Sequence, residues 1–264
     1  MPKVKVGEIN LYYEEFGEGP PAVLVSGLGN DHNMWSFQVE ELAKKYRVIV
    51  FDNRGIGRSD KPAGPYSTQQ MAADTDGLIQ ALGLGPVHLI GFSMGSLISQ
   101  WVAIKSPKLV RTLILIASYG KGGNFGVQLG SVWREIAINV GLDLLIREKA
   151  LWVFSRRCVD HRAKEFKWFK YFYGISQLTV DAYVAQNLAC VEHDASEDLH
   201  LIQAPSLIIS SPQDRITSAE YQEYLYDNIP NSKLVWVEDS CHGLLWEDAE
   251  RINAIIMDFL PSAE

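Results

Sequence analysis

The stretch "VHLIGFSMG", residues 87–95, joins a short apolar run to a serine that is flanked by glycines at two-residue spacing. The run predicts a buried strand, and the apolar residues of about 94–105 predict a helix. Ser93 would then lie on a sharp turn, where Gly91 and Gly95 have no Cβ to obstruct neighbouring backbone. The five residues GFSMG alone are a weak signal. With a strand before them and a helix after them, they predict a nucleophile elbow.

Further short, continuous apolar runs surround this stretch in the chain. Such runs are typical of strands that are covered on both faces, as in a parallel sheet between helices. They cover residues 22–26, 47–51, 112–117, 206–210 and 233–237. The N-terminal segments 3–7 and 10–16 alternate instead, which predicts an antiparallel hairpin at a sheet edge.

Helical patterns lie between the predicted strands, at about 67–82, 217–228 and 247–259. The first two each begin with a capping-box pattern, Ser67 with Gln70 and Thr217 with Glu220. Alternating strands and helices predict an open sheet of the α/β class.

Residues 120–198 break this rhythm, because they contain no clear buried strand and are rich in aromatic residues. We therefore expect two parts: a core formed by residues 1–119 and 199–264, and a helical lid insertion formed by residues 120–198.

Composition excludes several classes of function. The chain has 264 residues, a hydrophobic fraction of 47% and a net charge of −8, which argues against nucleic acid and anionic membranes as partners. It contains no apolar run of the roughly 18 residues that a membrane span needs. Its three cysteines, at irregular spacing, indicate free thiols and a cytoplasmic protein. No metal or cofactor motif is present, so we expect neither; the oligomeric state stays open.

A serine nucleophile needs a base and an orienting carboxylate. His242 is the one histidine of six that follows a late predicted strand in a loop. Asp214 follows the predicted strand 206–210 in the same way. In a parallel sheet both loops lie at the edge that carries Ser93, so we expect Ser93, His242 and Asp214 to form a catalytic triad.

A tetrahedral intermediate also needs donors for its oxyanion. The backbone N–H of Met94, directly after the nucleophile, is one candidate. The N–H of Leu28, in the loop "SGLGNDHNMW" of residues 26–35, is the other.

Together these residues resemble the α/β-hydrolase superfamily over nearly the whole chain outside 120–198. The elbow GFSMG, the loop "DNRGIGRSD" (52–60), the acid loop and "HGLLWE" (242–247) follow the family's order. The resemblance implies a mostly parallel central sheet with helices on both faces and a lid. It also implies the roles of nucleophile for Ser93, acid for Asp214 and base for His242. "LGNDHNMW" with "DNRGIGRSD" and "GPYS" is most similar to the 3-oxoadipate enol-lactonase and small-ester hydrolase branch.

Two features bear on the substrate. Aromatic residues could wall an acyl pocket, although the lid core is the simpler interpretation for most of them: Trp35, Trp133, Trp152, Phe154 and Trp168. Residues 147–170 also hold eight Lys or Arg against three acids. They could attract a carboxylate-bearing substrate, or they could simply form a solvated helix face.

These features predict a cofactor-free serine hydrolase of small carboxylic esters or lactones. Other chemistry on the same triad stays open: C–C bond hydrolysis of a diketone-like acid, a thioesterase or a biosynthetic cyclase. A receptor that binds a small molecule and keeps the triad is the alternative from another class. Steady turnover of esters would favour the enzyme, and ligand-dependent lid exposure with negligible turnover would favour the receptor.

Overall fold

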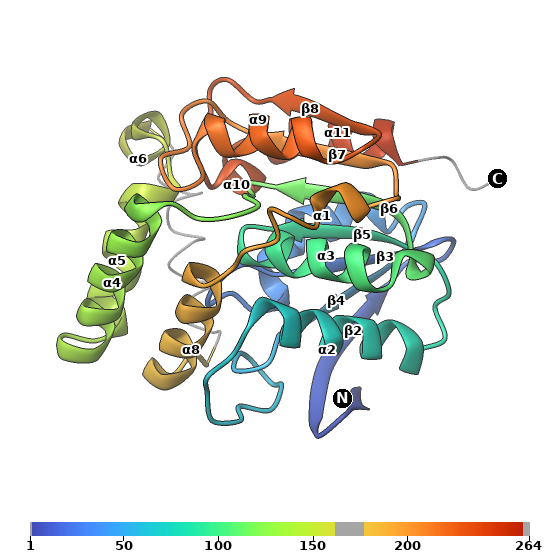
Figure 1. Ribbon diagram of the computed structural model, residues 1–264, viewed down its shortest axis with the longest axis horizontal. Coiled ribbons are helices and arrows are strands. Elements are labelled where there is room, and N and C mark those ends of the chain that lie inside the picture. Colours follow the sequence, from blue (N-terminus) through green and yellow to red (C-terminus); the bar gives the residue numbers. More distant parts are fainter. Residues whose placement is uncertain (1, 162–176, 261–264) are drawn as a thin grey trace.

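An eight-stranded sheet forms the centre of the computed structural model, which describes residues 2–161 and 177–260 (Figure 1). The strand order is β1-β2-β4-β3-β5-β6-β7-β8. As predicted, β1 and β2 form an antiparallel hairpin at one edge, and β3 to β8 run parallel. The strands are β1 (Lys3–Val6), β2 (Ile9–Phe16), β3 (Pro21–Val25), β4 (Arg47–Phe51), β5 (Val87–Phe92), β6 (Val110–Ile116), β7 (Ser206–Ser210) and β8 (Ser232–Trp236).

The central strands are buried on both faces, which explains their continuous apolar sequences. On β3, Val23 and Val25 belong to one apolar core, while Ala22 and Leu24 belong to the other. The first core packs against α2 (Thr68–Ala81), α3 (Met94–Lys105) and α9 (Ala219–Asn228), and the second against α1 (Ser36–Leu42), α10 (Leu244–Glu247) and α11 (Ala249–Phe259). Short 3₁₀ helices are η1 (His32–Trp35), η2 (Pro107–Leu109) and η3 (Leu199–Leu201). The predicted α/β class is therefore confirmed.

The two predicted capping boxes have different outcomes. Ser67 caps α2, because its side chain accepts a hydrogen bond of 3.1 Å from the Gln70 N–H. The prediction for Thr217 is wrong: α9 begins two residues later, and the Thr217 hydroxyl donates to the Asp214 carboxylate instead. The predicted helix over 247–259 is also interrupted, since Asp248, which separates α10 from α11, has a non-helical backbone conformation.

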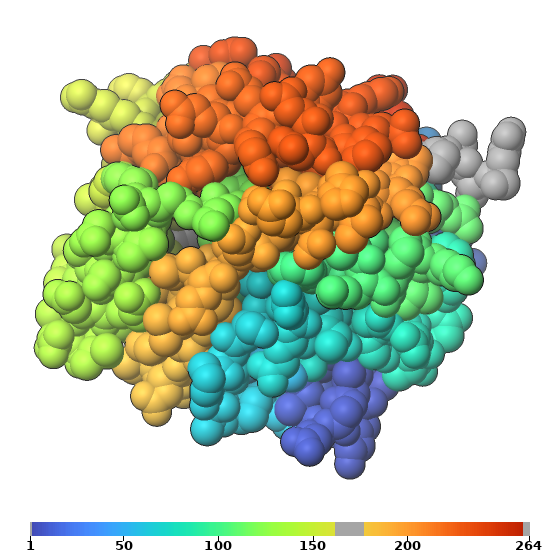
Figure 2. All heavy atoms as spheres, viewed as in Figure 1, coloured from blue at the N-terminus to red at the C-terminus, as the bar shows by residue number. Residues whose placement is uncertain are grey.

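Between β6 and β7, the described residues form four α-helices that lie together beside the sheet, at the left of Figure 1. They are α4 (Asn124–Asn139), α5 (Leu142–Val153), α6 (Arg156–His161) and α8 (Val180–Val191). Helix α4 packs against both α5 and α8, and Figure 2 shows their side chains meeting at this end of the molecule. Among the residues described, no helix combines the length and apolarity needed to cross a membrane.

His193, just after α8, joins this helical group to the core, and its burial is expected to make stability depend on pH. The ring is 2% exposed and contacts Thr68 Oγ1 at 3.0 Å and Gln100 Oε1 at 3.4 Å. Burial lowers the pKa of His193 from 6.5 to about 4, and Asp194 offsets this only in part. Between these values the unfolded chain binds the proton and the folded chain does not, so stability is lost as the pH falls.

Acidification should therefore destabilise the wild type more than His193→Gln. Between pH 7 and pH 5 we expect the free energy of unfolding to fall by about 2 kcal/mol more in the wild type, as measured by urea denaturation. His200→Gln, at an exposed position, is the matched control and should follow the wild type. Equal losses in the wild type and His193→Gln would show that His193 does not titrate in this range.

Candidate active site

Ser93 occupies a strained turn between β5 and α3. Its φ of 51° and ψ of −120° lie in a region that non-glycine residues rarely adopt. Its N–H continues the parallel ladder by donating to Ile116 O at 2.9 Å. A Cβ on Gly91 would lie 2.4 Å from Gly95 O, and one on Gly95 would lie 1.9 Å from Val25 O. The glycines are thus required by close backbone contacts, as the sequence predicts.

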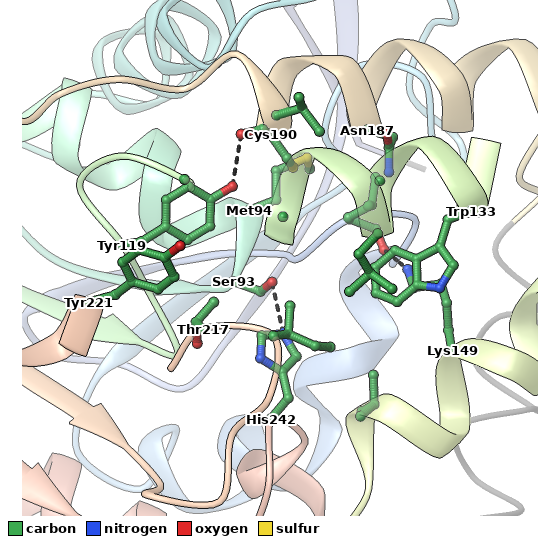
Figure 3. A pocket seen from close by; sticks show the side chains of 18 of the residues that line it. Ser93, Met94, Tyr119, Trp133, Lys149, Asn187, Cys190, Thr217, Tyr221 and His242 are labelled. Atoms are coloured by element: carbon green, nitrogen blue, oxygen red, sulfur yellow. Dashed lines mark hydrogen bonds between the residues drawn. The ribbon is translucent and has the colours of Figure 1, made fainter. Parts of the chain in front are cut away.

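The structure brings Ser93, His242 and Asp214 into one hydrogen-bonded chain. Figure 3 shows the contact between Ser93 and His242. His242 Nε2 lies 3.0 Å from Ser93 Oγ, and His242 Nδ1 lies 2.8 Å from Asp214 Oδ2. These distances suit a proton transfer from the serine hydroxyl to the imidazole and an Nδ1–H that donates to the carboxylate. His242 and Asp214 are buried, and they come from the loops after β8 and β7.

The surroundings of Asp214 favour its ionised form. Burial alone would raise the pKa of this carboxyl group, but His242 and the hydrogen bonds of Thr217 outweigh it and hold the pKa below 3.8. Asp214 Oδ1 accepts from the N–H groups of Ile216 at 2.8 Å and Thr217 at 2.9 Å, and Oδ2 accepts from the Thr217 hydroxyl at 2.6 Å. A carboxylate held in this way stays charged and orients the histidine ring.

The two predicted oxyanion donors, Leu28 and Met94, both line the pocket that contains Ser93 and His242. Met94 is the first residue of α3. The N–H groups in the first turn of a helix have no carbonyl acceptor within the helix, and the Met94 N–H is one of them. Around Leu28, Asn30 Nδ2 donates to Leu28 O at 3.3 Å, and the Gly29 N–H donates to Gln186 Oε1 at 3.0 Å. Helix α8 therefore contributes Gln186 to the support of this loop.

Of the aromatic residues named as candidates for the pocket wall, one of those described lines the pocket, and the others do not. Trp133 lines the pocket, but Trp35, Trp152 and Phe154 do not. Trp35 and Phe154 are at most 1% exposed in the core beneath α10 and α11. Trp152 is held outside the pocket, where its Nε1 donates to Glu148 Oε1 at 2.6 Å. Trp168 lies outside the described residues.

Several residues that line the pocket were not predicted from the sequence. Tyr119 follows β6, Tyr221 is on α9 and Trp246 is on α10, so they come from three separate segments. Tyr119 and Tyr221 are in ring contact, with centroids 5.8 Å apart. No local pattern marks these side chains, because only the packing of α9 and α10 brings them to Ser93.

The thiols near the site are not suited to replace the serine. Burial, together with the charge of Asp214, raises the pKa of Cys241, and its sulfur donates to Gln213 O at 3.2 Å. Burial raises the pKa of Cys190, which lines the pocket, to about 12. Both thiols are therefore protonated at neutral pH and are weak nucleophiles.

A separate buried cluster is the one group, within residues 2–161 and 177–260, whose ligand atoms could share a metal ion: Asp31, His32 and Asp52. Asp52 Oδ1 already accepts from His32 Nδ1 at 2.6 Å and from the His32 N–H at 2.9 Å, and Oδ2 accepts from the Arg58 N–H at 2.8 Å. Burial lowers the pKa of His32, but Asp52 and its other acidic neighbours raise it overall. Hydrogen bonds within the cluster thus fix the loop after β4, and none of its residues lines the pocket.

Comparison with known proteins places this geometry in a family. The family model for the alpha/beta hydrolase fold matches residues 20–249. AB hydrolase superfamily protein YisY of Bacillus subtilis is 29% identical over 95% of both chains. 3-Oxoadipate enol-lactonase 2 of Acinetobacter baylyi is 28% identical, over 88% of this chain and 86% of its own. A thermophilic esterase from Thermogutta terrifontis, solved with malate bound, is 28% identical, with a TM-score of 0.89 over 98% of both chains.

Proposed function

The chain belongs to the α/β hydrolase fold family, and from this premise we propose that it is a serine hydrolase of carboxylic esters or lactones. The observation that carries the proposal is the contact of 3.0 Å between His242 Nε2 and Ser93 Oγ in a pocket lined largely by apolar side chains. The names of the enol-lactonase and esterase relatives agree with this substrate class. We further propose that the helices of residues 120–198 act as the lid over this pocket.

In the proposed reaction Ser93 Oγ attacks the substrate carbonyl while His242 Nε2 takes the hydroxyl proton. The N–H groups of Leu28 and Met94 hold the oxyanion of the tetrahedral intermediate. The intermediate collapses as His242 gives the proton to the departing alcohol oxygen, which leaves an acyl group on Ser93. A water molecule, deprotonated by His242, then attacks the acyl carbonyl, and the carboxylic acid is released as Ser93 regains its proton.

The strain at Ser93 supports an enzyme over a receptor. A φ of 51° at a serine costs free energy of the order of 1–3 kcal/mol, and such strain is usually kept where a reacting group must be presented. C–C bond hydrolysis, a thioesterase and a cyclase would use the same groups, so only the substrate distinguishes them from ester hydrolysis.

Labelling and turnover together test the proposal. A fluorophosphonate should inactivate the protein with one adduct on Ser93, located by peptide mass spectrometry. A panel of esters, lactones, thioesters and β-diketones should show steady turnover of an ester or lactone. Chelators should leave this turnover unchanged, because the triad supplies the nucleophile and the base. Activity that is lost on chelation and restored by a divalent ion would overturn the serine mechanism, and labelling without turnover of any substrate would favour the receptor.

A further inference from the structure

Gln186, on α8, is a buried amide that joins this helix to two loops of the core. Its Oε1 accepts a hydrogen bond of 3.0 Å from the Gly29 N–H, and its Nε2 donates one of 2.9 Å to Arg54 O. Figure 1 shows α8 between α4 and the sheet. Burying an amide costs free energy unless its oxygen and its nitrogen have partners, and here both partners are backbone groups of the core. Gln186 therefore fixes one loop relative to the other.

The partner on one side belongs to a β-turn that contains Leu28. The Asn30 N–H donates to Gly27 O at 3.1 Å, which closes a turn over residues 27–30. Gly29, the third residue of this turn, has a φ of 76°, as a type II turn requires. Type I and type II turns differ mainly in the orientation of their middle peptide group. The group that runs from the Leu28 carbonyl to the Gly29 N–H is therefore the part of the turn that needs support.

Hydrogen bonds hold both ends of this middle peptide group. Gln186 accepts from its N–H, and Leu28 O accepts from Asn30 Nδ2 at 3.3 Å. The Leu28 N–H belongs to the preceding peptide group, whose carbonyl, Gly27 O, accepts from the Asn30 N–H. Because the N–H and C=O of a planar trans peptide point in opposite directions, these bonds together determine the direction of the Leu28 N–H.

The partner on the other side is itself held by the core. Arg54 lies in the loop after β4, and its guanidinium donates two hydrogen bonds to the Asp74 carboxylate of α2, at 2.5 Å and 2.6 Å. Both side chains are buried. A bidentate pair of this kind restricts the position of the arginine. Arg54 O is thus a fixed acceptor for the Gln186 amide, and Gln186 extends this support to the turn of residues 27–30.

We propose, on the basis of the serine hydrolase function above, that Gln186 is a positioning residue for the oxyanion hole. It acts through the turn of residues 27–30 and holds the Leu28 N–H where the oxyanion of the tetrahedral intermediate forms. Helix α8 also lines the pocket, through Asn187, Cys190 and Val191. One helix thus forms part of the pocket wall and supports an oxyanion donor, so the oxyanion hole depends on the packing of α8 against the core.

A purely structural role for Gln186 gives a different result. Loss of a structural hydrogen bond lowers stability, but the molecules that remain folded react at the wild-type rate. Loss of a positioning residue slows the step in which charge develops on the oxyanion, even where the variant is fully folded. Labelling of Ser93 by a fluorophosphonate reports this step, because negative charge develops on the phosphoryl oxygen as Ser93 attacks. It also requires no knowledge of the natural substrate.

The experiment measures the second-order rate constant of this labelling in Gln186→Met, which keeps the size of the side chain and loses both hydrogen bonds. We expect a rate at least tenfold below that of the wild type, since removal of an oxyanion donor itself costs about 100-fold to 1,000-fold. For any ester that is turned over, kcat should fall by a similar factor, while KM should change less than threefold.

Asn253→Leu is the matched control, because it removes another buried amide. Asn253, on α11, donates to Phe37 O of α1 at 2.9 Å and does not line the pocket. This variant should lose stability as Gln186→Met does, but its labelling rate should stay within threefold of the wild-type rate.

Gln186→Glu supplies a second readout. A protonated carboxyl group can accept from the Gly29 N–H and donate to Arg54 O, whereas the ionised group has no donor. Burial raises the pKa of a carboxyl group toward neutrality. The labelling rate of Gln186→Glu, divided by that of the wild type at the same pH, should therefore rise as the pH falls from 9 to 6. If Gln186→Met fails to fold, this ratio decides.

The outcomes distinguish this inference from the proposed function. A wild-type labelling rate in Gln186→Met, or a Gln186→Glu ratio that does not change with pH, would overturn the positioning role and leave the serine mechanism intact. A wild-type protein that is not labelled on Ser93 would overturn the proposed function, and the positioning role with it.

Discussion

Ser93→Ala should lower kcat/KM for the ester or lactone substrate of the proposed reaction by about 10⁴-fold or more. The reason is geometric: the Ser93 Oγ, 3.0 Å from His242 Nε2, is the proposed nucleophile, and alanine leaves only the oxyanion donors and substrate binding. His242→Ala should have an effect of similar size. The double variant should be little worse than either single variant, because the two groups act as a unit. Initial rates at substrate concentrations well below KM measure the effect.

Folding controls separate lost chemistry from lost structure. Ser93→Ala keeps the Cβ and the backbone conformation and removes only the hydroxyl and its contact with His242, so its free energy of unfolding should change by no more than about 1 kcal/mol. Thermal unfolding followed by circular dichroism should show a transition close to that of the wild type. Retention of even a tenth of the wild-type activity by Ser93→Ala would contradict the serine mechanism.

The strand pattern could be predicted from the sequence because a parallel sheet between two helical layers has no polar face. Strands β4, β5 and β7 have the residues that their apolar runs indicate. The proximity of Ser93, Asp214 and His242 could also be predicted. Each residue follows a parallel strand, and the carboxyl ends of parallel strands lie at one edge of the sheet. Both inferences depend on rules that act along the chain and do not need the detailed packing.

Thr217 shows where such local rules fail. Thr217 and Glu220 have the spacing of a capping box. However, the buried Asp214 carboxylate lies three residues before Thr217 and needs hydrogen-bond donors. A buried charged acceptor gains more from a hydroxyl than an exposed helix end does, so the tertiary partner takes the side chain. Sequence periodicity contains no information about which loops are buried. The sequence therefore does not show that the Asp214 carboxylate competes with the helix end for the Thr217 hydroxyl.

The pocket wall could not be predicted, because distant segments form it. Trp35 and Phe154 are large aromatic residues like Trp133, but they pack into the core beneath α10 and α11, whereas Trp133 lines the pocket. Lys149 is one of eight basic residues in its stretch, and only the packing of α5 against the pocket distinguishes it from Arg147. The lining of the pocket is thus determined by the placement of the helices and not by a motif.

Gly95→Ala should have a large effect on both stability and activity, although it adds a single methyl group. The new Cβ would lie 1.9 Å from Val25 O and 2.9 Å from Ser26 O, and both contacts are with backbone. Neither backbone atom can move without shifting β3 or the loop that carries Leu28, so α3 must separate from the sheet. We expect the free energy of unfolding at pH 7, measured by urea denaturation, to fall by about 3 kcal/mol or more.

The control uses the same change at a glycine without such neighbours. Gly126, in α4, has no heavy atom of the described residues within 4 Å of its would-be Cβ, so Gly126→Ala should leave stability equal or raise it by up to about 1 kcal/mol. Comparing the stabilities of Gly95→Ala and Gly126→Ala separates the effect of the close contact between α3 and β3 from the general preference of helices for alanine.

Gly95→Ala should also lower activity. Because Ser93 lies between Gly91 and Gly95, a displaced α3 would move the Ser93 hydroxyl away from His242 and lower kcat at least 100-fold. A stable, fully active Gly95→Ala protein would show that the turn at Ser93 does not require a glycine at this position.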